Sequence, residues 1–284
     1  MALRNGFCLV LGAAVTVLAS LAVPGCANGS SREVPLAGAE STTAGALAVD
    51  VQNQLGEVEV VVDPMVTRPF VEAVPMTRTA PMGPIDRVST FKPWVAGQIS
   101  ESEGGRILRV LCTAREGEAP RPVYILVRVP SCEGVRVRNT GGPVTLTGVG
   151  GTIDVETTPG TRGLWDEGAA VRMRTTREVA SNVSLISSDG EVLMTVPWKS
   201  KGKIEAQAPV TIIQIAAVPE AQSNGAATTS LNGQYTGSIN GGDNAITLRS
   251  GTRVRFTTTY EPVPYPPKHA TAGTQSTPPE SGAK

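Results

Sequence analysis

This chain of 284 residues has few histidines and aromatic residues, and it has no excess of charge of either sign. It has one histidine, 4% aromatic residues, and 25 basic against 25 acidic side chains. The balanced charge gives no overall attraction to nucleic acid or to an anionic membrane, and the few aromatics argue against a base-stacking platform. His269 lies in a Pro-rich segment near the C-terminus, where no rigid scaffold supports a His-based triad or metal site. We therefore expect no cofactor, no metal and no nucleic-acid partner.

Long helical segments are also missing from the pattern. The chain contains 31 Gly and 22 Pro, which interrupt helices throughout, while 40% hydrophobic residues are enough for a core. A helical bundle and a wholly disordered chain are both disfavoured. The composition favours a globular protein built from short strands and turns.

The N-terminus reads as a targeting segment over residues 1–25. Arg4 precedes an apolar run that ends at Val23-Pro24-Gly25-Cys26. This end resembles the lipobox of bacterial lipoproteins, a family in which the chain is cleaved before the Cys. The resemblance implies that the Cys26 thiol carries a diacylglycerol with acyl chains such as palmitate. The alternative is an ordinary secretory signal that is cleaved nearby, with Cys26 incidental.

The lipobox resemblance also predicts a location. Two or three acyl chains hold a soluble domain at a bilayer, at roughly 0.8 kcal/mol per buried CH₂. Ala27, rather than Asp, follows the Cys, which in this family favours the outer membrane. We expect an envelope protein with a membrane partner through its lipid anchor, at the outer membrane if the cell has one and otherwise on the outer face of the plasma membrane.

Composition divides the rest of the chain. Residues 26–45 are small and polar and read as a flexible tether. Residues 46–259 form the predicted globular domain, in which the Pro- and Met-rich segment 64–105 is expected to be an irregular excursion. Residues 260–284 are rich in Pro, Ser and Thr and are expected to be a disordered tail.

Apolar residues alternate with polar residues through most of the domain. Val58, Val60 and Val62 are one example, and Ile153 with Val155 is another. This period of two is typical of strands buried on one face. Gly-centred turns precede many of these pairs, at Gly56, Gly142, Gly151, Gly190 and Gly202. Repeated short strands joined by such turns indicate a meander or a solenoid.

A spacing of 18 residues favours stacked strands. The alternating segments centred on Arg136, Asp154 and Arg172 recur at that interval. Stacking at about 4.8 Å would place basic pairs against acidic pairs in a ladder worth roughly 0.2–1 kcal/mol per contact. The alternative is that charges simply occupy exposed strand positions. The predicted ladder consists of Arg136, Arg138, Asp154, Glu156, Arg172 and Arg174.

Several of these segments resemble one known family. The apolar strand Val123-Tyr-Ile-Leu-Val-Arg-Val-Pro130 precedes Gly134-Val-Arg-Val and Asn139-Thr-Gly-Gly-Pro-Val-Thr-Leu, and later copies begin at Leu231-Asn-Gly and Ile246-Thr-Leu. Over about residues 45–258 they are similar to the DUF4097 family of putative adhesins. The resemblance implies an all-β fold, a single β-solenoid or β-roll of stacked short strands, exposed at the cell envelope. It implies no ligand and no functional residues.

Two cysteines remain after processing, because Cys8 leaves with the signal and Cys26 is the lipid site. Cys112 and Cys132 could form a disulfide in an exported protein. A bridge closing a loop of about 20 residues would contribute roughly 3 kcal/mol. Two separate thiols are the alternative.

Two function classes follow from these features. The preferred one is a non-catalytic, membrane-tethered envelope lipoprotein, which presents a β-repeat surface for adhesion or for interaction with an envelope protein or a glycan. The alternative is a β-helix carbohydrate-active enzyme, a lyase or hydrolase, with Asp154 and Glu156 as acid and base. Their separation of about 6.5–7 Å along one strand is compatible with glycosidase chemistry. A position in a groove beside Trp165 would favour the enzyme, and a position against arginines on a flat face would favour the binding protein.

The anchor can be tested by replacing Cys26 with Ser, which removes the thiol that would be acylated. We expect the protein to move from the membrane fraction to the soluble fraction, because no acyl chain then holds it at the bilayer. Immunoblotting of fractionated cells measures the distribution. A Cys26→Ser protein that stays with the membrane would contradict the lipoprotein interpretation.

Overall fold

The computed structural model describes residues 32–38, 46–78, 85–86, 94–102, 105–160, 168–215, 227–230 and 233–259. In that part of the chain the regular elements are strands, so the predicted all-β class is confirmed. None of the described residues belongs to a helix long and apolar enough to cross a membrane. Cys26, Trp165, the signal segment and the C-terminal tail lie outside the described residues.

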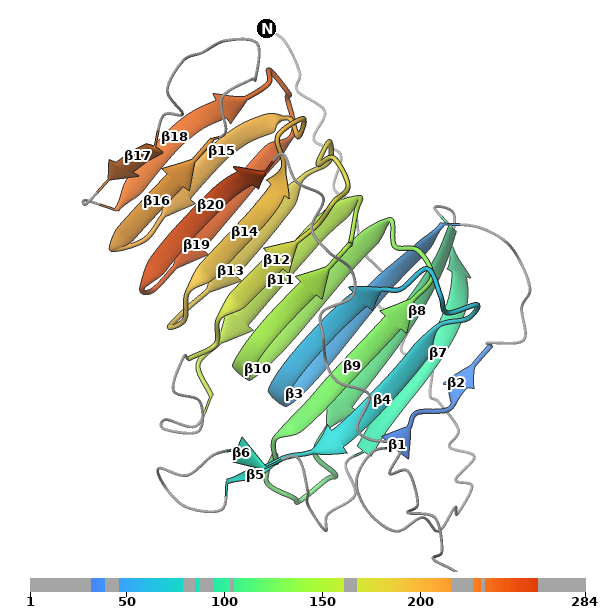
Figure 1. The fold of residues 1–284 in the computed structure, drawn as a ribbon. Helices are drawn as coiled ribbons and strands as arrows, with labels where there is room; N and C mark the ends of the chain where they lie inside the picture. The colour runs from blue at the N-terminus through green and yellow to red at the C-terminus, as the bar shows by residue number, and fades with distance from the viewer. Residues whose placement is uncertain are drawn as a thin grey trace, which may run out of the picture.

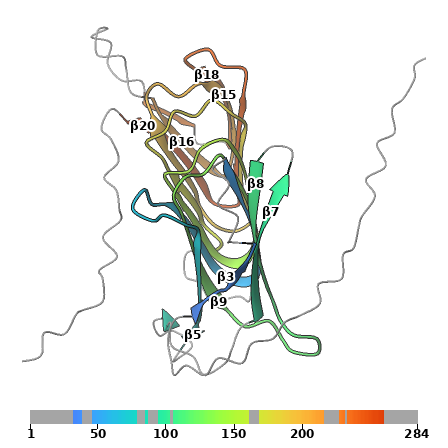
Figure 2. The ribbon, with the colours of Figure 1, turned by 90° about the vertical axis from the view of Figure 1, so that its right-hand side faces the viewer.

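The strands form one large, mixed and mostly parallel sheet that is folded into two rows (Figure 1). Two long strands, β3 (Leu47–Val62) and β10 (Gly134–Thr147), run through both rows and join them. We call the row that contains their first halves row A and the other row B. Figure 2 shows the rows as two layers seen from the side.

Row A consists, in spatial order, of β7 (Trp94–Ser102), β8 (Gly105–Thr113), β3, β10, β11 (Thr152–Thr158), β13 (Val183–Ser187), β19 (Ala245–Ser250), β15 (Gly202–Gln207) and β18 (Gln234–Ile239). Row B consists of β4 (Phe70–Pro75), β9 (Val123–Val129), β3, β10, β12 (Val171–Arg174), β14 (Val192–Pro197), β20 (Arg253–Thr259), β16 (Val210–Gln214) and β17 (Ala227–Ser230).

The spatial order departs from the chain order at two places. The earliest long strand, β3, lies between β8 and β10 in row A and between β9 and β10 in row B. The last two strands, β19 and β20, lie between the β13–β14 pair and the β15–β16 pair. Neither insertion is visible in the spacing of the sequence repeats, because both bring together strands that are far apart in the chain.

Two predicted boundaries are wrong in part. The segment predicted as an irregular excursion supplies β4 and β7, each antiparallel to a neighbour in the large sheet. The segment predicted as a tether contains β1 (Arg32–Glu33) and β2 (Leu36–Ala37), which pair with β4 and β7. Between them Val34 is buried, and its amide donates to the carbonyl of Val71 at 2.8 Å. These additions cover strand edges that would otherwise present unpaired backbone groups. A separate two-stranded sheet consists of β5 (Thr77–Arg78) and β6 (Ile85–Asp86).

The core lies between the two rows. Alternate residues of every long strand point inward and form one continuous apolar cluster, so the period-two pattern of the sequence predicted the buried side correctly. Val137 and Val155 of row A are fully buried, as are Leu146 and Phe256 of row B. Burial of this kind contributes about 1.5–3 kcal/mol for each large aliphatic side chain.

A column of buried polar residues lies at the corner where the chain passes from row A to row B. Each member occupies the same register position, at the end of its row A strand. The column consists of Asn53, Asn139, Thr157, Ser187 and Ser250, and we call it the corner column. The first four are buried and Ser250 is half-buried.

The side chains of the corner column bind the backbone of the crossing. Asn139 Nδ2 donates to the carbonyl oxygens of Gly56 and Gly142 at 2.9 and 2.7 Å, and Asn139 Oδ1 accepts from Asn53 at 3.0 Å. Thr157 and Ser187 both donate to the carbonyl of Ala169, at 2.6 and 2.8 Å. The bend therefore leaves these carbonyl groups satisfied inside the core.

Gly56 is required at this bend. Its φ of +134° lies in a region that other residues rarely adopt, and a Cβ there would come within 1.9 Å of the carbonyl oxygen of Val123. Gly56, which the sequence analysis placed at a turn, therefore lies at a corner where two backbones approach each other closely.

Replacing Asn139 with Ala tests the corner column. The change leaves the carbonyls of Gly56 and Gly142 without their side-chain donor, so we expect the free energy of unfolding to fall by about 3 kcal/mol. Urea unfolding followed by circular dichroism measures it. The neighbouring Thr140→Ala is the control, since that hydroxyl pairs only with Thr158 near the surface and should matter by about 0.5 kcal/mol or less. Equal effects of the two changes would show that the corner amide is not important.

Candidate interaction surface

The outward face of row A carries charges of alternating sign. Arg109, Asp50, Arg136 and Asp154 are consecutive register partners on β8, β3, β10 and β11. Neighbouring strands lie about 4.8 Å apart, so each charge lies beside its opposite. The predicted ladder is therefore present between β10 and β11, and it continues to Asp50 and Arg109, which the sequence reasoning missed. The alternation of Asp50 with Val49 and Val51 was the signal that could have placed it on this face.

Arg138 holds the two carboxylates that were predicted as an acid–base pair. Its guanidinium lies 2.5 Å from Asp154 Oδ2 and 3.4 Å from Glu156 Oε2. The side chains remain 33–45% exposed, and neither carboxylate lines a described pocket. Exposed pairs of this kind contribute about 0–1 kcal/mol each. Both carboxylates therefore contact one arginine on an open strand face.

Arg172 and Arg174 do not belong to this ladder, and that part of the prediction is wrong. They lie on β12 in row B, opposite Thr145 and Thr147 of β10. The strand that follows β11 in row A is β13, where Asp154 faces Ser184. The 18-residue interval fails here because the connection between β11 and β12 is longer than the bend within β10.

The outward face of row B differs along its length. At the β3–β9 end it is apolar and buried, and the cluster there consists of Val61, Val74, Met76, Tyr124 and Leu126. Glu59 is buried beside this cluster, and its carboxylate accepts a hydrogen bond from the Tyr124 hydroxyl. From β12 to β16 the face carries outward arginines, threonines and a few aliphatic residues. Among the described residues, exposed charge on the first part is limited to the end of β9, at Arg128, whereas the second part carries exposed arginines on two strands.

Cys112 and Cys132 are separate buried thiols, so the disulfide alternative is contradicted. Cys112 is the register partner of Asn53, where the row A half of β3 ends, whereas the amide of Glu133, next to Cys132, donates to the carbonyl of Leu47 at the start of β3. Six residues of extended strand separate Leu47 from Asn53 by about 20 Å. A disulfide needs Cα atoms about 6 Å apart.

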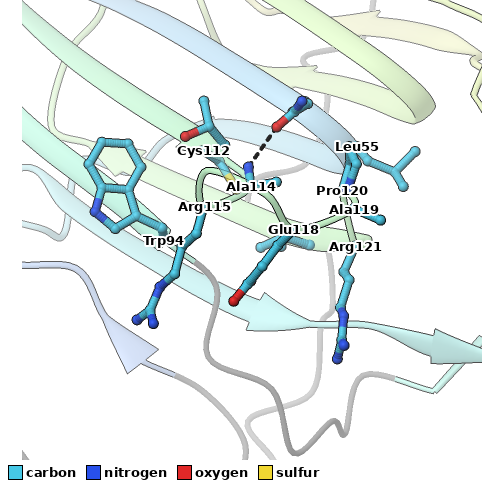
Figure 3. A pocket seen from close by; sticks show the side chains of 12 residues that line it. Leu55, Trp94, Cys112, Ala114, Arg115, Glu118, Ala119, Pro120 and Arg121 are labelled. Carbon is cyan, nitrogen blue, oxygen red and sulfur yellow. Dashed lines mark hydrogen bonds between the residues drawn. The ribbon is translucent and has the colours of Figure 1, made fainter.

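One described pocket lies at the corner between β8 and β9 (Figure 3). It encloses about 30 Å³, which is room for roughly one water molecule. The amide of Ala114 donates to Gln54 Oε1 at 2.6 Å across it, and Trp94 at its rim is 44% exposed. The side chains of Arg115 and Arg121 extend away from Cys112. The pocket is too small for an organic ligand.

A second hollow lies at the far corner, beside β15 and β18. It is open, has a volume of about 580 Å³, and is lined by small and polar residues together with one charged side chain, Arg249. Among the described residues no group of three or more His, Cys, Asp or Glu side chains is arranged to hold a metal ion. The charged strand faces are therefore the described features with the clearest capacity for binding.

Comparison with known proteins gives likenesses of fold only. No family model and no curated protein matches the sequence, so membership of the DUF4097 family stays a prediction. The structure is similar to a putative cell adhesion protein from Clostridium sporogenes, with 10% identity and a TM-score of 0.47 over 82% of this chain and 100% of that chain. It is also similar to a putative lipid binding protein from Parabacteroides distasonis, with 10% identity and a TM-score of 0.27 over 60% of this chain and 68% of that chain.

Burial of the two thiols makes the stability of the protein depend on pH in the alkaline range. Burial raises the pKa of Cys112 to about 12 and that of Cys132 to about 11, from an ordinary value of 9.0. Between pH 9 and the raised pKa values, the thiols lose their protons in the unfolded chain and keep them in the folded protein. The stabilisation is therefore complete below pH 9 and is lost as the pH rises toward 11.

We expect the urea midpoint of the native protein to fall between pH about 8 and about 10. The fall should be smaller in the Cys112→Ala, Cys132→Ala double variant, which keeps the other titrating groups and so serves as the control. Unfolding curves at both pH values measure the difference. An identical pH dependence in the two proteins would contradict the account of the thiols.

Proposed function

We propose that the protein is a non-catalytic cell-envelope lipoprotein. Its two rows would act as a solenoid scaffold, tethered through Cys26, that presents outward strand faces to an envelope protein or a glycan. The observation that carries this proposal is the arrangement of Asp154 and Glu156. Both contact Arg138 on an exposed strand face, where they act as partners in a charge ladder.

The fold supports a presenting role in a second way. Side chains on the outward face repeat at fixed spacings along many parallel strands, so the faces are extended and regular. Extended surfaces of this kind suit polymeric or elongated partners, because each strand offers one contact and many weak contacts add up. The covered strand edges at β1 and β2 help to keep such a sheet from pairing with other sheets.

The double variant Asp154→Asn, Glu156→Gln tests the non-catalytic role. We expect the native protein to release no reducing ends from polygalacturonate or from isolated envelope polysaccharide. We expect the variant to fold and to sediment with envelope fragments as the native protein does, because the lost ion pairs are exposed and contribute about 0–1 kcal/mol each. Reducing-end assays and sedimentation measure the two properties.

The enzyme interpretation makes the opposite forecast for the same pair of proteins. General acid–base catalysis contributes about 10²–10⁴-fold, so the variant would lose polysaccharide cleavage that the native protein shows. Cleavage by the native protein together with its loss in the variant would refute the proposal.

A further inference from the structure

The strands of the exposed half of the row B face carry positive charge and no negative charge. The strands involved are the second half of β10 together with β12, β14, β20 and β16, and they contain four arginines and no Asp or Glu. Row A contains charges of both signs, with Asp50, Asp154 and Glu205 among its acids. This half of the row B face therefore differs in charge from the outward face of row A.

The register of the strands fixes where these arginines lie. Arg172 of β12 faces Leu193 of β14, which in turn faces Arg255 of β20. Two strand steps separate the two arginines by about 10 Å, and Arg174 lies about 7 Å from Arg172 along the same strand. Arg174 and Arg255 are exposed, and Arg172 is half-buried. The three side chains form an array of cations spaced about 7–12 Å apart.

Threonines lie beside the arginines on the same face, although Leu193 lies between Arg172 and Arg255. Arg174 faces Thr195, and Thr195 faces Thr257, while Thr145 and Thr147 lie on the other side of β12. Hydroxyl groups donate and accept hydrogen bonds with the hydroxyl groups of sugars. The array therefore combines groups that bind carboxylates with groups that bind sugar rings.

A fourth arginine has a nearby acid and belongs to the edge of the array. Arg253 precedes Val254, which faces Val192, so Arg253 lies beside the half-buried Glu191. The exposed Arg174 and Arg255 and the half-buried Arg172 define the surface, and we call these three residues the arginine array.

We propose that the arginine array binds an acidic polysaccharide, whose carboxylates lie along the arginines of β12 and β20. This inference rests on the proposed function and names the class of its partner. An extended polymer matches a flat surface whose cations repeat, since guanidinium groups bind carboxylates in a bidentate manner. The array is exposed to solvent, so the attraction falls as salt rises.

An anionic membrane surface fits the array less well. Proteins that lie on membranes insert apolar side chains beside their basic residues. Among the described residues the exposed large apolar side chains are Met65 and Trp94, and neither lies on the strands of the array. Leu193, between Arg172 and Arg255, is half-buried. The threonines beside the arginines have no role against lipid, whereas they have one against sugar.

The test uses the full chain with Cys26→Ser as a common background, so that acyl chains do not bind vesicles. The variant is Arg174→Gln, Arg255→Gln. The matched control is Arg109→Gln, Arg249→Gln, which removes the same charge from exposed positions of row A. The probes are polygalacturonate, neutral dextran, and vesicles of phosphatidylglycerol with phosphatidylcholine. Biolayer interferometry measures binding at low and moderate salt, and circular dichroism checks the fold of each protein.

We expect the array variant to bind polygalacturonate about tenfold more weakly, which corresponds to about 1.4 kcal/mol. The control should bind within about twofold of the background protein, and raising the salt should weaken binding in both the background and the control. Dextran should not bind measurably.

Three results would overturn the inference. They are an equal loss in the variant and the control, dextran binding as tight as polygalacturonate binding, and tighter binding to the vesicles than to the polymer. If the background protein binds envelope fragments but not polygalacturonate, the inference fails while the proposed function stands. If it binds neither, both fail.

Discussion

The hydrogen bonds of the buried Asn139 amide are the contacts on which the rest of the arrangement depends. A strand that leaves one layer and enters the next must turn its backbone through the core, where unpaired carbonyl groups are costly. Asn139 satisfies two of these carbonyls and accepts from Asn53 on the neighbouring strand. Thr157 and Ser187 serve the following crossing in the same way. The corner column allows short apolar strands to occupy both layers around one continuous core.

A sheet folded in this way has two outward faces that share one interior. The inward positions are nearly all aliphatic in both rows, because they fill the same space. The outward positions have no such common requirement, so row A carries a balanced ladder around Arg138 while row B carries arginines at β12 and β20. The charge of each outward face is therefore independent of the packing of the core, so the two faces can differ in charge.

The sequence was sufficient for features that depend on neighbouring residues. The alternation around Val155 predicted which side chains are buried, and the interval from Arg136 to Asp154 predicted a register that the structure shows. It was insufficient where the outcome depends on distant parts of the chain. The insertion of β3 beside β8, and of β19 beside β13, leaves no periodic trace. The longer connection before β12 moved Arg172 to the other row.

The candidate surface likewise depends on distant parts of the chain more than on neighbouring residues. The sequence predicted a Gly-centred turn at Gly142 and no role in the core for Asn139, whose side chain is buried and binds the backbone of the crossing. The arginine array brings together β12 and β20, which are about 80 residues apart in the chain and become neighbours through β14. No local pattern could have joined them, since neither strand alone shows a surface.

Chemical modification of arginines tests most directly the claim that the two faces have different roles. The protein is treated with phenylglyoxal with and without polygalacturonate, and mass spectrometry measures the modification of each arginine. The account predicts that the polymer protects Arg174 and Arg255 of row B and leaves Arg109 and Arg249 of row A unchanged. Equal protection on both faces, or protection confined to row A, would contradict it.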